Sequence, residues 1–305
     1  MSFSQDVKEE ICAKKITSDC CVQAACYGAA CFGKYFDTRG VVLQTETQAV
    51  AHYVKKLYQR CEIRGNIETK ERPSGPIYEF SIKDPAEVEK LLVLFGHTGS
   101  ETTLRINPAN FHCPKCYSAF VSTAFLCSGT ITDPSKEYSL EFFTSRYNLA
   151  RDFESILGEH EFQSHRTQRK GANVIYIKAS EEIENILAYM GAGKAAMNIM
   201  NSRMYKDVRN KTNRISNCEA ANINKRVQAT VQVKKAVEYL QSRGYWEDLS
   251  TPVKVAATMR LTYPEYSLSE LAAVFDPPVS KSGLSHQLKK VTDTAKKLQE
   301  IEENA

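Results

Sequence analysis

The 305-residue sequence contains no run of 18 apolar residues and begins without the basic and then apolar pattern of a secretory signal peptide. We therefore expect a cytoplasmic protein that does not span a membrane. A reducing compartment also disfavours disulfide bonds. Cys12, Cys20, Cys21, Cys26 and Cys31 fall in helix-like sequence, and we interpret them as small apolar core residues.

Acidic residues are scarce in one part of the chain. Residues 1–192 contain 22 Lys and Arg against 24 Asp and Glu, whereas residues 193–305 contain 18 against 12. Between residues 194 and 235, ten basic residues accompany only Asp207 and Glu219. Such a segment suits a polyanionic partner, although a solvated helix face is the alternative interpretation. Aromatic residues are also scarce there, which favours duplex DNA over single strands or RNA.

An internal repeat organises the first two thirds of the chain. Residues 83–96 share five identities in fourteen positions with residues 178–191, and the helix-like run 21–33 corresponds to 117–129. Helical and alternating patterns follow in the same order in both copies. The sequence therefore predicts an α+β fold in which two copies, about 19–96 and 114–191, each contain a small sheet.

The expected elements follow from these patterns. After a leading helix at 4–14, the first copy is predicted to contain helices 19–33, 48–61 and 84–95 and strands 41–46, 65–71 and 77–82. The second copy is predicted to contain helices 114–128, 145–158 and 180–190 and strands 138–143, 162–168 and 173–178. Only helices are expected after residue 193, at 194–208, 217–243, 252–262, 267–275 and 280–298.

The last two helices have the spacing of a helix-turn-helix. Apolar residues mark the inner face of the first helix, and Leu284, Leu288 and Val291 mark that of the second, which Ser280 is placed to cap. Short polar groups would reach base edges while lysines neutralise phosphates. The predicted DNA-binding residues are Ser280, Lys281, Ser282, Ser285, His286, Lys289 and Lys290, with Arg209, Lys211, Arg214, Lys225 and Arg226 upstream. A generic helical hairpin is the alternative.

Two motifs, together with the duplication, resemble the WhiA family. They are Asn213-Arg-Ile-Ser-Asn-Cys-Glu-Ala-Ala-Asn222 and Leu268-Ser-Glu-Leu-Ala, the latter followed by Asp276-Pro-Pro-Val-Ser-Lys-Ser-Gly-Leu-Ser-His286. The resemblance covers nearly the whole chain. It implies a LAGLIDADG homing-endonuclease-like domain at 1–192, basic linker helices at 193–226 and an all-α helix-turn-helix domain at 227–305.

The resemblance also implies a role. It suggests a sequence-specific transcription regulator linked to cell division, chromosome segregation and sporulation in Gram-positive bacteria, and associated with the nucleoid. Double-stranded DNA is the expected partner. A transcription or cell-division protein is a candidate second partner, through the N-terminal domain.

The same resemblance raises the question of nuclease activity. In active LAGLIDADG enzymes, an acidic residue before the closing glycine of each repeat helix binds a divalent metal. Phe32 and Ser128 occupy these positions here, so we expect no catalytic residues, no cofactor and no enzyme activity. Asp37 and Asp133, four residues past the glycines, are interpreted as turn formers. The alternative functions are a residual metal-dependent DNA endonuclease and a protein-interaction scaffold that reaches DNA through a partner.

Cys113-Pro-Lys-Cys116 has zinc-knuckle spacing. A structural zinc normally takes four ligands, and no second such pair follows in the sequence. Cys127 could serve as a third ligand only if the helix folded back. We therefore interpret Cys113 and Cys116 as a cysteine pair at a helix start and predict no metal site.

Overall fold

The structure is a computed structural model that describes residues 2–73 and 75–303. The chain divides into two compact units, one ending at Lys206 and the other starting at Asp207, and the boundary falls within helix α8 (Gly193–Ser242). No helix in the described residues is long and apolar enough to cross a lipid bilayer.

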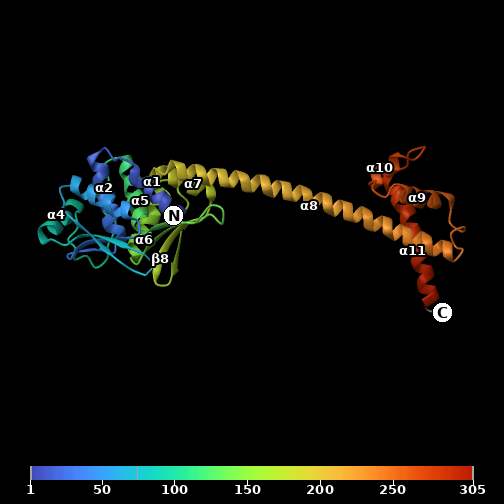
Figure 1. Cartoon of the computed structure of the whole chain (residues 1–305), viewed down its shortest axis with the longest axis horizontal. Helices are drawn as coiled ribbons and strands as arrows, with labels where there is room; N and C mark the ends of the chain where they lie inside the picture. Colours follow the sequence, from blue (N-terminus) through green and yellow to red (C-terminus); the bar gives the residue numbers. More distant parts are fainter. Residues whose placement is uncertain (1, 74, 304–305) are drawn as a thin grey trace. The chain divides into compact units, whose positions relative to one another are not determined.

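The first unit contains two copies of one α+β arrangement (Figure 1), which confirms the predicted duplication. Each copy has a four-stranded antiparallel sheet, of order β1-β2-β4-β3 in the first and β5-β6-β8-β7 in the second. The strands are β1 (Tyr35–Asp37), β2 (Gly40–Thr45), β3 (Asn66–Lys70), β4 (Ile77–Ile82), β5 (Gly129–Ile131), β6 (Leu140–Thr144), β7 (His165–Arg169) and β8 (Ala172–Ile177). The helices are α1 (Phe3–Ala13), α2 (Asp19–Phe32), α3 (Gln48–Arg60), α4 (Pro85–Phe95), α5 (Pro114–Ser128), α6 (Tyr147–Glu159) and α7 (Ser180–Met190), with a 3-10 turn at Pro108–Asn110.

Helices α2 and α5, one from each copy, pack side by side through the middle of the first unit (Figure 1). A Cβ atom at Gly28 would lie 2.5 Å from Thr123 Oγ1 and 2.6 Å from the carbonyl oxygen of Phe120. The two backbones therefore approach as closely as a residue without a side chain allows. Alanines flank this contact, and Ala25, Ala29 and Ala124 are fully buried.

The second unit is helical. Its core consists of apolar residues from the C-terminal part of α8, from α9 (Thr251–Thr262), from α10 (Leu268–Ala273) and from α11 (Lys281–Glu303). Ser267 and Glu270 form a reciprocal capping box at the start of α10, in which each side chain accepts the other residue's backbone N–H. Leu271, Leu284 and Val291 are fully buried between α10 and α11, as the apolar spacing predicts.

Apart from shifts at the ends of several elements, the structure differs from the predicted elements in two respects. Strands β1 and β5 were not predicted, because three residues are too few to show an alternating pattern. The break expected between residues 208 and 217 is absent, and α8 is continuous there. That stretch contains Asn, Thr and Ser but neither Gly nor Pro, so it lowers helix propensity without ending the helix.

Candidate nucleic-acid interface

Helix α11 begins as the sequence predicts. The Ser280 hydroxyl accepts the backbone N–H of Gly283 at 3.1 Å and so caps the first turn. Because Leu284 and Leu288 turn inward, Ser282 and His286 are left exposed. The first two turns of α11 thus present a polar surface whose position is set by the buried face of the same helix.

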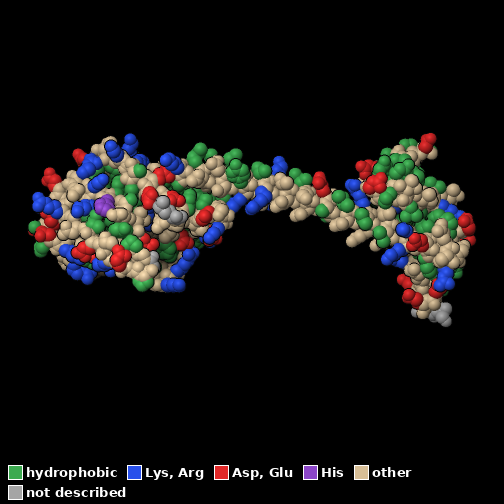
Figure 2. Space-filling view, viewed as in Figure 1, with side chains coloured by type: hydrophobic (Ala, Val, Ile, Leu, Met, Phe, Trp, Pro, Cys, Tyr) green, Lys and Arg blue, Asp and Glu red, His purple; other side chains and the backbone are tan. Residues whose placement is uncertain are grey.

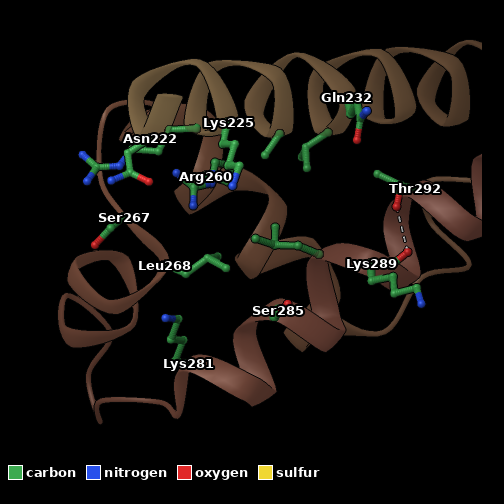
Figure 3. A pocket seen from close by; sticks show the side chains of 14 residues that line it. Asn222, Lys225, Gln232, Arg260, Ser267, Leu268, Lys281, Ser285, Lys289 and Thr292 are labelled. Atoms are coloured by element: carbon green, nitrogen blue, oxygen red, sulfur yellow. Dashed lines mark hydrogen bonds between the residues drawn. The ribbon is translucent and has the colours of Figure 1, made fainter. Parts of the chain in front are cut away.

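A groove with a volume of about 690 Å³ lies between α8 and the helix-turn-helix (Figure 3). Figure 3 shows Lys225 of α8 and Arg260 of α9 on one side, with Lys281 and Lys289 of α11 on the other. Arg226 also lines the groove. No Asp or Glu is among the described residues that line it, so the groove combines five cations from three helices. This arrangement suits a chain of phosphates.

The groove divides the predicted residues of α11 into two sets. Lys281, Ser285 and Lys289 line the groove. Ser282, His286 and Lys290 are exposed but do not line it. The helix therefore has one side that continues the basic surface of α8 and another that presents Ser282, His286 and Lys290 to solvent.

The basic residues of α8 are not all part of this groove. Lys225 and Arg226 line it, whereas Arg209, Lys211 and Arg214 lie nearer the start of the helix. At about 1.5 Å per residue, Arg214 is ~16 Å along the helix axis from Lys225. These three side chains are exposed. In Figure 2, lysine and arginine side chains are visible along α8 and over the second unit, with acidic side chains among them.

Arg260 was not singled out in the sequence. It is only 2% exposed, and its Nη1 donates a hydrogen bond of 2.6 Å to the carbonyl oxygen of Tyr266, just before α10. Burial, aided by the charge of Arg226, lowers the pKa of Arg260. Arg226 itself donates to the carbonyl oxygen of Glu265 at 3.2 Å. The two arginines therefore hold the loop that leads into the helix-turn-helix, besides lining the groove.

In the first unit, α2 ends at Phe32 and α5 ends at Ser128. Phe32 is buried, and its ring centroid lies 4.8 Å from that of Phe153. The Ser128 hydroxyl donates to the carbonyl oxygen of Ala124 at 3.0 Å. Neither side chain offers a carboxylate to a metal.

A cavity of about 340 Å³ lies at these helix ends, and no acidic residue is among its described lining residues. Arg146 lines it and donates from Nη1 to the carbonyl oxygen of Cys31, 2.7 Å away at the end of α2. Lys34 lines it too. Lys34 and Arg146 place positive charge in this cavity, which opposes the binding of a divalent cation there.

Known proteins are similar to this chain over nearly its full length. A family model described as the WhiA C-terminal HTH domain matches residues 212–295, and one described as the WhiA LAGLIDADG-like domain matches residues 117–209. A protein of Ruminiclostridium cellulolyticum, named "Probable cell division protein WhiA", is 31% identical over an alignment of 311 positions that covers 98% of each chain. The chain belongs to the WhiA family.

Other members agree with this assignment. A Clostridium botulinum protein of the same name is 30% identical over 318 residues, covering 98% of this chain and 99% of that one. The crystal structure of full-length WhiA from Thermotoga maritima matches with a TM-score of 0.62 at 20% identity, over 97% of this chain and 99% of that one. The fold of this WhiA protein is thus a duplicated LAGLIDADG-like unit followed by a helical helix-turn-helix unit.

Asp37 and Asp133 form turns in this WhiA chain, as interpreted from the sequence. Asp37 accepts the backbone N–H of Arg39 at 2.9 Å, and hydrogen bonds from the Arg39 guanidinium lower the pKa of Asp37. Asp133 accepts the backbone N–H of Ser135 at 2.8 Å. Both carboxylates are therefore engaged in local turns that follow the helix ends.

The cysteines are arranged differently from the prediction. Cys113 and Cys116 stand at the start of α5, as expected, but Cys20 and Cys21 at the start of α2 lie against them. Cys21 is buried and Cys20 only half-buried. The second cysteine pair does not lie downstream of Cys116 but comes from the other repeat. The repeat offset of 96 residues, which aligns Cys20 with Cys116, was the available signal.

Proposed function

We propose that this protein is a sequence-specific regulator of transcription that binds duplex DNA through its helix-turn-helix and the adjoining part of α8. The groove lined by Lys225, Arg226, Arg260, Lys281 and Lys289 is the observation that carries this proposal. A domain with a helix-turn-helix docks its second helix in the major groove, and cations beside that helix contact the phosphates.

The two sides of α11 would then have different roles in DNA binding, one contacting phosphates and the other contacting bases. Lys281 and Lys289, together with Lys225 on α8, would neutralise backbone phosphates. Ser282 and His286, which are exposed outside the groove, would face base edges. Ser280 is engaged in capping the helix, so its contribution would be mainly to hold the first turn in place.

The first unit would serve as a platform for a protein partner of transcription or cell division. The near balance of basic and acidic residues in 1–192 gives it little electrostatic attraction for DNA of its own. The name of the relatives supports a role in cell division, and we extend this proposal to chromosome segregation, sporulation and a position at the nucleoid.

The proposed roles of the two sides of α11 can be tested with the purified full-length protein, after it has selected its preferred sequences from a random pool of DNA duplexes. The double variant Lys281→Ala, Lys289→Ala is expected to weaken binding to all duplexes alike and to reduce the salt slope of log K by roughly 1 for each lysine removed. Ser282→Ala and His286→Ala are expected to change the preferred sequence instead. Fluorescence anisotropy across a salt series, with a repeated selection, measures both.

Lys297→Ala is the matched control, because this exposed lysine lies on α11 sixteen residues beyond Lys281. It is expected to leave affinity and preference almost unchanged. Equal effects of all these variants on every sequence would show that α11 does not read bases. Failure of the purified protein to bind any duplex would favour a scaffold that reaches DNA through a partner.

We also propose that the LAGLIDADG-like unit does not cleave DNA. Supercoiled plasmid incubated with the full-length protein and Mg²⁺ or Mn²⁺ is expected to remain intact, because Phe32 and Ser128 offer no carboxylate to a metal ion and Arg146 lines the cavity at these helix ends. Agarose electrophoresis separates nicked from supercoiled plasmid. Nicking by the wild-type protein that disappears in Asp37→Asn or Asp133→Asn would overturn this proposal.

A further inference from the structure

The starts of α2 and α5 bring four cysteine side chains into one cluster. Cys20 and Cys21 lie in the first turn of α2, and Cys113 and Cys116 in the cap and first turn of α5. The Sγ atom of Cys113 lies 3.7 Å from that of Cys20 and 3.6 Å from those of Cys21 and Cys116. All four Sγ atoms lie within 4.8 Å of one another.

These separations match those of a mononuclear zinc site. Four thiolates placed tetrahedrally at about 2.3 Å from a zinc ion lie about 3.8 Å from one another. Three of the six pairs in the cluster, all involving Cys113, are already within 0.2 Å of that value. A cluster of several irons would hold four sulfur ligands further apart than a single ion does, so the compact arrangement favours one tetrahedral ion.

The helix starts and a nearby hydroxyl group favour thiolates in this cluster. The cluster lies at two helix N-termini, where free backbone N–H groups and the helix dipole stabilise negative charge. The Ser18 hydroxyl lies 3.0 Å from Cys20 Sγ, within reach to donate a hydrogen bond to it. Cys21 and Cys116 are buried while Cys20 and Cys113 are half-buried, which leaves a path for a metal ion from solvent.

We propose that Cys20, Cys21, Cys113 and Cys116 bind one Zn²⁺ ion and that this ion joins the two repeats at the start of their central helices. The four thiols release their protons to solvent as they bind, and no electron is transferred. A structural site of this kind is closed, since all four positions are taken by protein ligands.

Such an ion would act on the interface between the repeats. Cys113 lies 93 residues after Cys20 and 92 residues after Cys21 in the chain. The four ligands come together only in the folded protein. A metal ion that binds them therefore stabilises the packing of α2 against α5. In this role the zinc would be structural and would take no part in DNA recognition.

The metal content of the full-length protein, purified under reducing conditions without chelator, tests this directly. Inductively coupled plasma mass spectrometry is expected to find one zinc ion per chain. The double variant Cys113→Ser, Cys116→Ser is expected to lose it, whereas Cys61→Ser should retain it. Cys61 is a matched control because it touches only one other thiol among the described residues, that of Cys26 at 3.8 Å.

A cobalt experiment keeps the test independent of whether the double variant folds. After the wild-type protein is stripped of metal and given Co²⁺, a tetrahedral four-thiolate site is expected to give intense visible ligand-field bands and near-ultraviolet thiolate charge-transfer bands. One equivalent of Zn²⁺ should remove them. The proposal is overturned if the protein carries no zinc and shows no such bands, or if Cys113→Ser, Cys116→Ser retains the ion. It is also overturned if mass spectrometry of the freshly purified chain shows disulfides among these cysteines.

Discussion

Leu284→Ala is expected to lower the free energy of unfolding of the second unit by about 2–5 kcal/mol, the usual cost of a cavity at a fully buried leucine. Leu284 is 0% exposed and lies in the first turn of α11, packed in a core with Leu271 of α10. Net stabilities of domains are only about 5–15 kcal/mol, so this loss is a large fraction of the total. Helix α11 would lose its place against α10, and DNA binding would fall with it.

Calorimetry of the full-length protein measures this effect, because the cores of the two units share no residue and should unfold separately. The transition of the second unit is expected to move down in temperature while that of the first stays in place. Val255→Ala on α9 is the matched control, since its side chain is 43% exposed and its loss should change stability by no more than about 0.5 kcal/mol. Equal shifts from both substitutions would contradict the assigned core.

The fold could be predicted wherever a periodic pattern was long enough. The repeat was visible because α4 and α7 keep identical residues at matching positions, as at Glu87 and Glu182 in their first turns, and because the apolar period persists through each helix. Strands of three residues show no period, so β1 and β5 were missed. The continuity of α8 was also missed, because Asn210 and Asn213 lower helix propensity without deciding the structure.

The candidate DNA site was predictable only within single helices. The spacing of Leu284, Leu288 and Val291 indicated which side of α11 faces the core, and hence which polar residues are exposed. The spacing could not show that Lys281 and Lys289 face Lys225 across a groove, because that depends on how α8 packs against α11. The direct DNA contacts of these residues remain predictions.

Two further features depend on long-range packing in the same way. The position of Arg260 depends on its hydrogen bond to the carbonyl oxygen of Tyr266 and on its burial, and neither can be predicted from a sequence pattern. The cysteine cluster requires the starts of α2 and α5, at Asp19 and Pro114, to meet although they are 95 residues apart in the chain. The alignment of the repeats predicts such a meeting only once α2 and α5 are known to pack against each other.

Gly28→Ala is expected to destabilise the first unit by about 1–3 kcal/mol, because the added methyl group must displace backbone atoms. Its Cβ would lie 2.6 Å from the carbonyl oxygen of Phe120, which is part of helix α5 and cannot rotate away as a side chain could. The two central helices would have to move apart, which disturbs every alanine contact along them. Thermal or urea unfolding of the full-length protein, followed on the transition of the first unit, measures the change.

Gly158→Ala is the same substitution at a site where no neighbouring helix is in contact. Gly158 lies within helix α6, and a Cβ atom there would meet no other atom within 4 Å. Alanine is the better helix former by roughly 0.5–1 kcal/mol, so this variant is expected to be more stable than the wild type. If Gly28→Ala lowers the stability of the first unit and Gly158→Ala raises it, the α2–α5 contact is the cause of the difference. If both substitutions stabilised the protein, the two helices could not be in the close contact on which the pseudo-symmetric core depends.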